Sequence, residues 1–236
     1  MALSRRDFVK LCSGTVAGFG VSQMFHPAIH EAFAQTLTGE RPPVFWVQGQ
    51  GCTGCSVTLL NSTHPSIADV LLKIISLEFH PTVMAAEGEG AYEHMMRVAE
   101  KFKGKFIFAV EGAVPVAHDG KCCVVAEAGH HEVTMTEVTK VLAANAAAVL
   151  AVGTCAAYGG IPAGKGNETG AMGVAAFLKK EGIPAPVINI PGCPPHPDWI
   201  VGTIGLGLQA LATNTLGLLV KQGLDANGRP KAFYKK

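Results

Sequence analysis

The sequence predicts an α/β protein built on one doubly wound parallel sheet. Short apolar runs alternate with segments of helical periodicity, as strands and crossover helices do in this fold class. The runs are continuously apolar, which is typical of parallel strands covered by helices on both faces. With 236 residues, the chain is long enough for one full-sized domain and at most a small appendage.

Apolar runs mark the expected strands at 44–47, 74–79, 106–110, 148–152 and 187–190. Helical patterns fall between and after them, at 56–60 with 67–73, 89–103, 136–145, 171–181 and 199–212. Residues 122–126 are expected to form a short additional strand or hairpin arm. No mature segment is long and apolar enough to predict a membrane span.

The composition is apolar, with 48% hydrophobic and 16% charged residues, against roughly 25% charged in an average soluble domain. A wholly buried sheet, a surface covered by a partner, or both would explain this. The formal net charge of +1 gives no indication of nucleic-acid binding.

The N-terminus has the features of a twin-arginine export signal over residues 1–34. Arg5 and Arg6 precede a weakly apolar, Gly-containing segment, and Ala32-Phe33-Ala34 is a small-x-small cleavage site. The alternative is an ordinary N-terminal helix with two arginines. We therefore expect a signal at 1–34, one domain at 35–212 and a polar connecting segment at 213–236.

Four cysteines each follow a predicted strand. Cys52 and Cys55 lie in Gly51-Cys52-Thr53-Gly54-Cys55-Ser56, Cys155 lies in Gly153-Thr154-Cys155, and Cys193 lies in Pro191-Gly192-Cys193-Pro194-Pro195. Loops beyond the carboxyl ends of parallel strands emerge along one edge, so these thiols can converge. Four converging thiolates with neighbouring glycines favour one [4Fe-4S] cluster.

Other interpretations apply to each cysteine motif taken alone. A single C-x-x-C pair can be a redox dithiol or half a zinc site, and a lone Cys155 or Cys193 is most often a packed thiol. Structural zinc sites usually use two close ligand pairs, whereas one pair and two remote cysteines occur here. This spacing favours iron–sulfur chemistry.

The remaining cysteines are not expected to bind the metal. Cys12 lies inside the expected signal, and the adjacent Cys122 and Cys123 are expected to be structural thiols. His196, three residues after Cys193, could donate a hydrogen bond to a cluster sulfur or cap the Pro-rich turn.

A histidine pair and a glutamate pair also have both a structural and a functional interpretation. His130 and His131 are expected in a solvated loop rather than at a metal. Glu87 and Glu89 begin a predicted helix, where the helix dipole explains a carboxylate, with a proton-relay role as the alternative.

Taken together, the three cysteine motifs resemble those of small subunits of periplasmic nickel–iron hydrogenases, most of all the selenium-containing subgroup. The similarity runs from the export signal past Trp199, so it covers nearly the whole chain. The resemblance implies a flavodoxin-like domain whose proximal [4Fe-4S] cluster is held by Cys52, Cys55, Cys155 and Cys193.

The resemblance also implies partners and a location. A large subunit would carry the nickel–iron centre, and electrons would pass between it and a periplasmic carrier such as a cytochrome c. The chain would be periplasmic, exported by the twin-arginine route, with membrane association left open, and would not be catalytic alone.

The sequence departs from the family pattern at two places. Gly51 stands where many members have a glutamate, and no cysteine follows Cys193 to ligate medial and distal clusters. A fragment, a natural short form or a different electron acceptor would each explain the second departure.

The sequence is also compatible with two alternative functions. One is a cluster subunit of the related quinone-reducing complexes, which share the Pro-Gly-Cys-Pro-Pro loop but typically have adjacent cysteines at the first ligand position. The other is an exported zinc-binding interaction protein with no redox role.

Overall fold

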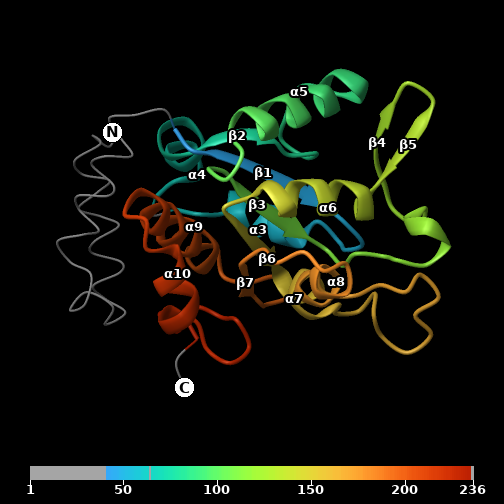
Figure 1. Cartoon of the computed structure of the whole chain (residues 1–236). Helices are drawn as coiled ribbons and strands as arrows, with labels where there is room; N and C mark the ends of the chain where they lie inside the picture. The colour runs from blue at the N-terminus through green and yellow to red at the C-terminus, as the bar shows by residue number, and fades with distance from the viewer. Residues whose placement is uncertain (1–40, 64, 235–236) are drawn as a thin grey trace.

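The computed structural model describes residues 41–63 and 65–234, so the signal expected at 1–34 lies outside the described residues. The central sheet comprises β1 (Pro43–Gln48), β2 (Ser76–Phe79), β3 (Ile107–Glu111), β6 (Ala148–Val152) and β7 (Val187–Ile190). The order is β2-β1-β3-β6-β7 and each pairing is parallel (Figure 1). This is the flavodoxin-like strand order, so the predicted fold class is confirmed.

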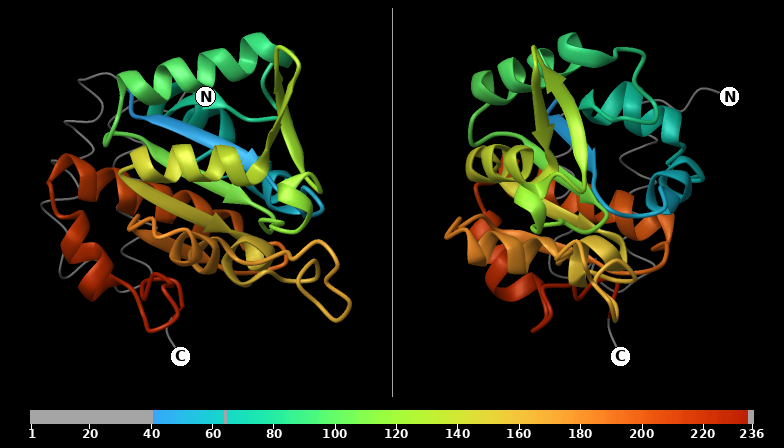
Figure 2. Two further views of the ribbon diagram at one scale, coloured as in Figure 1. Left: turned by 45° about the vertical axis from the view of Figure 1, so that its right-hand side comes forward. Right: turned by 90° about the vertical axis from the view of Figure 1, so that its right-hand side faces the viewer.

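Helices cover both faces of the sheet (Figure 2). One layer holds α5 (Gly88–Lys101), α6 (Met135–Asn145) and α8 (Val174–Lys180). The other holds α3 (Gly54–Leu60), α4 (Ile67–Asp69) with the π-helical turn Val70–Ile74, and α9 (Pro197–Ala212). Successive strand residues point to opposite faces, so Phe45 and Val47 enter the first core and Val44 and Trp46 the second.

Helix starts follow local capping chemistry. Thr134 and Glu137 form a capping box at the start of α6, where each side chain accepts the other residue's backbone N–H. At α9, Pro197 takes the first position, where its missing N–H costs nothing, and the His196 side chain accepts the N–H of Asp198.

The structure differs from the sequence-based elements at several boundaries. The segment expected to be helical at 67–73 changes to π-helical geometry at Val70, and β2 begins only at Ser76. A short helix that the sequence did not predict, α7 (Gly153–Tyr158), contains Cys155. The start of β2 depends on where the strand can pair with its neighbour in the sheet. Local hydrophobicity does not predict this position.

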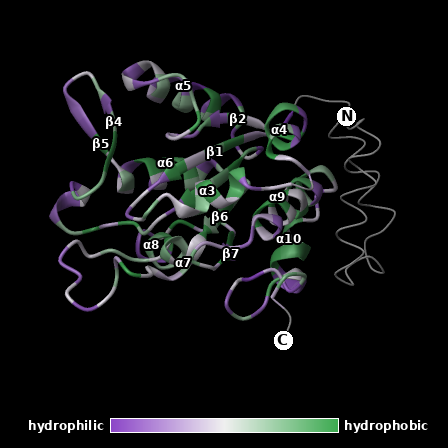
Figure 3. Ribbon diagram, turned by 180° about the vertical axis from the view of Figure 1, so that it is seen from behind, coloured by the Kyte–Doolittle hydropathy of each residue, from purple (hydrophilic) through white to green (hydrophobic). Residues whose placement is uncertain are grey.

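The predicted hairpin arm is real but shifted. Strands β4 (Val124–Ala128) and β5 (His131–Thr134) pair antiparallel, after a 3₁₀ turn at His118–Gly120, and project from one end of the molecule (Figure 1). Figure 3 shows hydrophobic residues along the central strands and hydrophilic ones along β5 and the loop between α7 and α8. The hairpin projects from the sheet, but Val133 of β5 is buried in the first core and Val125 and Ala126 of β4 pack against it.

Residues after α9 fold back onto the sheet. Helix α10 (Leu216–Leu218) and the π-helical turn Leu219–Gly223 lead into a loop along β7, where the N–H of Asn189 donates to the Gly228 carbonyl at 2.8 Å. This covers the β7 edge, which would otherwise leave backbone groups unpaired. Over the stretch from 41 to 234, leaving out residue 64, no helix has the length and hydropathy of a membrane span.

Candidate metal centre

The four candidate cysteines lie at the carboxyl edge of the sheet. Cys52 lies in the turn after β1, and Cys55 lies in the first turn of α3. Cys155 is in α7, directly after β6, and Cys193 follows the end of β7. Because β1, β6 and β7 run parallel in one sheet, these strand ends share one edge.

Backbone contacts join the three loops. A Cβ built on Gly153 would lie 2.4 Å from the Cys55 Sγ, so this sulfur sits against the backbone of the Cys155 loop. The N–H of Thr154 donates to the Gly192 carbonyl at 2.9 Å, and the N–H of Gly192 donates to the Thr154 Oγ1 at 3.1 Å. The loops that carry Cys55, Cys155 and Cys193 are therefore in direct contact.

Gly153 meets two requirements at once. Its φ of 86° lies in the left-handed region that side chains rarely adopt. The missing side chain also leaves the space that the Cys55 sulfur occupies.

The Cys55 thiol is strongly affected by its surroundings. Burial raises the pKa of Cys55 well above its usual value, and negative charge on Glu111 and the other three cysteines raises the pKa further. The other three cysteines act on Cys55 because they lie in the same loop or in the loops that contact it. A metal bound here would have to displace the proton, as metals do from cysteine.

Cys155 has a similar environment with one difference. Burial raises the pKa of Cys155, as do Cys193 and Cys52, but a hydrogen bond from the Ile161 backbone N–H to the sulfur opposes this rise. Such amide donors to sulfur stabilise the thiolate, the form that binds iron. The loop after α7 therefore supplies a donor as well as a ligand.

The chemistry of this donor set fits a four-iron cluster. All six cysteines of the described residues are free thiols, with Cys52 and Cys193 exposed. Within residues 41–63 and 65–234, no three His, Cys, Asp or Glu side chains could hold a metal ion together. A [4Fe-4S] cube does not need its ligands close enough to share one ion, because each thiolate binds its own iron at a separate corner.

A buried carboxylate beside the thiols was missed by the sequence reasoning. Glu111 ends β3 and is only 2% exposed. Its Oε1 accepts the backbone N–H groups of Cys55 at 2.9 Å and Ser56 at 3.2 Å. Its Oε2 accepts from Trp46 Nε1 at 3.0 Å, Gln48 Nε2 at 3.1 Å and Ser56 Oγ at 2.5 Å. The only sequence signal was a glutamate that directly extends an apolar strand.

His80 extends this hydrogen-bond network. Its Nδ1 accepts the N–H of Thr82 at 3.1 Å, so Nε2 carries the hydrogen and donates to Ser56 Oγ at 3.2 Å. Burial lowers the pKa of His80, which favours the neutral ring. The serine hydroxyl points to Glu111 rather than to the imidazole, so this is not a nucleophilic triad.

The histidine and carboxylate candidates have structural partners. His196 caps α9 by accepting the Asp198 N–H at 3.3 Å, which supports the capping interpretation. Glu89 accepts the Gly129 N–H at 2.7 Å and ties α5 to the β4–β5 hairpin, whereas Glu87 makes no side-chain cap at the start of α5.

The other candidates lie on the hairpin. His130 and His131 are exposed, and His131 Nε2 lies 3.1 Å from Glu137 Oε1. Cys122 and Cys123 precede β4, and burial raises the pKa of Cys123, which packs against the first core.

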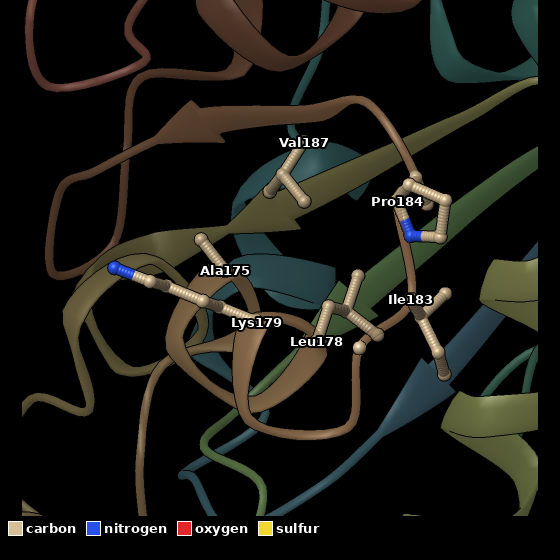
Figure 4. A pocket seen from close by; sticks show the side chains of 8 residues that line it. Ala175, Leu178, Lys179, Ile183, Pro184 and Val187 are labelled. Atoms are coloured by element: carbon tan, nitrogen blue, oxygen red, sulfur yellow. The ribbon is translucent and has the colours of Figure 1, made fainter.

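A shallow depression of about 460 Å³ lies away from the thiols (Figure 4). Its lining comes from α8 and the segment leading into β7, and Lys179 supplies its one charged side chain. In Figure 4, Lys179 extends away from Ile183 and Pro184. The depression reaches Val187 at the start of β7, whereas Cys193 lies beyond its end, so it is not part of the cysteine site.

A flavodoxin-like sheet with four free thiols at its carboxyl edge is the arrangement expected of the iron–sulfur subunits of redox complexes, a class of protein. Residues 52–206 match the family model described as NADH ubiquinone oxidoreductase, 20 Kd subunit. This description refers to the quinone-reducing complexes, to which one of the alternative functions belongs.

Individual relatives are more specific. The chain is 54% identical over 239 residues to the periplasmic [NiFeSe] hydrogenase small subunit of Desulfomicrobium baculatum, covering 99% of this chain and 75% of that one. It is 38% identical over 202 residues to the hydrogenase-2 small chain of Escherichia coli (strain K12), covering 86% of this chain but spanning only 51% of that relative.

Solved structures agree with these relatives. The recombinant [NiFeSe] hydrogenase from Desulfovibrio vulgaris Hildenborough superposes with a TM-score of 0.82 at 67% identity, covering 85% of this chain and 72% of that chain. The chain belongs to the family of hydrogenase small subunits. Members of this family are parts of an oxidoreductase rather than complete enzymes, as the resemblance implied.

Proposed function

We propose that this chain passes single electrons between a hydrogenase active site on a large partner subunit and an external carrier. The path would be one [4Fe-4S] cluster held by Cys52, Cys55, Cys155 and Cys193. The observation that supports this most is the gathering of these thiols by contacts between their loops, at Gly153 and between Thr154 and Gly192.

In this proposal, each residue has a defined role. The four thiolates each hold one iron, and the bound cluster supplies a one-electron redox couple. The Ile161 N–H stabilises charge on the Cys155 sulfur, and Gly153 lets the Cys55 sulfur approach the neighbouring loop. One cluster is proposed because these four cysteines supply one thiolate for each of its four irons.

The large subunit would cover the face around the thiols. Val57, Tyr158 and Ile161 lie within a few residues of a proposed ligand cysteine, and these residues are 53%, 48% and 84% exposed. Large apolar side chains grouped on an exposed surface are typical of a protein interface. Burial of this face would also exclude water from the cluster.

The location and the external carrier are further parts of the proposal. The expected twin-arginine signal at 1–34 and a relative named as periplasmic both support a periplasmic subunit. A periplasmic electron carrier such as a cytochrome c would then exchange electrons with the complex. Twin-arginine transport moves folded proteins, which suits a subunit whose cluster is inserted beforehand.

Anaerobic purification of the chain with its large subunit tests the proposal. Besides the iron of the nickel–iron centre, we expect about four iron and four acid-labile sulfide per copy of this chain, and an electron paramagnetic resonance signal from the cluster on reduction. Cys155→Ser and Cys193→Ser should lose this signal, whereas the matched controls Cys122→Ser and Cys123→Ser should keep it. A colourless chain with one zinc would overturn the proposal.

A further inference from the structure

Glu111 is not one of the proposed cluster ligands. It lies between the end of β3 and the start of α3, the helix that carries Cys55. A carboxylate that is 2% exposed is costly to bury unless hydrogen bonds compensate its lost hydration. Its five hydrogen bonds, to backbone and side-chain donors, supply that compensation.

These donors define the charge state of the carboxylate. The N–H groups of Cys55, Ser56 and the Trp46 ring can only donate, and they occupy both oxygens of Glu111. Both oxygens therefore act as acceptors, as in an ionised carboxylate. Within residues 41–63 and 65–234, no Lys or Arg forms an ion pair with Glu111.

The charge is thus held by neutral dipoles and not cancelled by a cation. Dipoles orient and stabilise a charge and weaken its field, but they do not cancel it. In a protein interior, where the dielectric is low, this field acts over several ångströms on any nearby redox group. The bond from the Cys55 N–H places Glu111 beside one of the four candidate ligands.

We propose that Glu111 is a positioning residue that holds Cys55 at the start of α3, and that its fixed negative charge lowers the reduction potential of the cluster. The inference rests on the proposed function, because it requires a cluster at Cys55. Reduction adds one electron, supplied by hydrogen oxidation at the partner, and a nearby negative charge opposes that addition. Cluster potentials respond to local charge and hydrogen bonding in this way.

The test is a redox titration of the anaerobically purified complex, followed by electron paramagnetic resonance. Glu111→Gln removes the charge but turns an amide N–H toward the Trp46 ring N–H, so it is combined with Trp46→Phe. We expect a more positive potential in the double variant, with iron content retained. Trp46→Phe alone, which leaves the charge, should lack this positive shift.

A variant with the opposite sign separates electrostatics from damage to the fold. Ser56→Ala keeps the charge but removes the hydroxyl that donates to Oε2, so the less compensated carboxylate should shift the potential to more negative values. Structural damage alone has no reason to move the two variants in opposite directions. Glu111→Asp, which keeps the charge on a shorter side chain, should stay closer to the wild-type potential than the double variant.

Two results would overturn the inference. One is a double variant with full iron content and an unchanged reduction potential. The other is a shift of the same sign and size in the double variant and in Ser56→Ala. If the double variant loses its iron, the Ser56→Ala titration decides, and a potential that does not fall overturns the inference. A wild-type complex without any cluster signal would instead overturn the proposed function itself.

Discussion

Replacing Gly153 by alanine tests the contact between the Cys55 and Cys155 loops. The residue has a φ of 86°, where a side chain costs about 1–2 kcal/mol. The new Cβ would also lie 2.4 Å from the Cys55 sulfur, so that sulfur must move to beyond 3.0 Å. An off-rotamer side chain adds about 0.5–1.5 kcal/mol. The total expected loss of stability is about 1.5–3.5 kcal/mol, with Cys55 displaced from its place among the candidate ligands.

Gly166→Ala is a matched control. Gly166 has the same φ of 86°, but a Cβ there would meet nothing within 4 Å. This variant should lose only the backbone share, about 1–2 kcal/mol. Thermal unfolding reports the stability of each variant, and iron per chain after anaerobic purification reports the site. We expect Gly153→Ala to lose iron and Gly166→Ala to retain it, and equal iron contents would refute the reasoning.

Three further predictions concern the C-terminal loop and the partner-facing surface. Tyr234→Phe removes the hydroxyl that donates to the Pro191 carbonyl at 2.7 Å, so local stability should fall by about 0.5–1.5 kcal/mol, measured by amide hydrogen exchange in this loop. Hydrogen bonds from Arg229 lower the pKa of Asp225 below its unfolded value, so the stability it contributes is present at neutral pH and lost as pH falls through the folded pKa. Asp225→Asn should therefore destabilise the chain at pH 7, with the difference from wild type vanishing in acid. Ile161→Glu should weaken binding of the large subunit about 10- to 100-fold, measured by titration, because it removes about 1.5–3 kcal/mol of apolar burial.

Each of these has a control. Tyr158→Phe removes a longer hydroxyl contact, 3.3 Å to the Asn227 carbonyl, and should change exchange less than Tyr234→Phe. Leu72 is 71% exposed on the π-helical turn, remote in sequence from every ligand loop, so Leu72→Glu should leave partner binding unchanged. An Asp225→Asn deficit that persists unchanged in acid would contradict the linkage argument.

Local patterns were sufficient for element type and for showing that the candidate cysteines follow strands. The apolar runs that predict β1, β3, β6 and β7 are long, uninterrupted and flanked by helical periodicity, and they appear in the structure with shifts of one residue at most. The four cysteines stand out because each follows such a run in a Gly-containing loop. By contrast, the start of β2 and the helix α7 depend on neighbours in space, and local sequence does not report them.

The hydrogen-bond network around Glu111 shows which features the sequence predicts and which require the tertiary structure. The sequence by itself determined an α/β sheet, its strand-end thiols and a family resemblance, since periodicity and motif spacing are local properties of the chain. Only the tertiary structure decided that Trp46, Ser56 and His80 share one network with Glu111, up to 65 positions away. The physical reason is that β3 lies beside β1 in the sheet, which brings the end of one strand against the turn that follows the other.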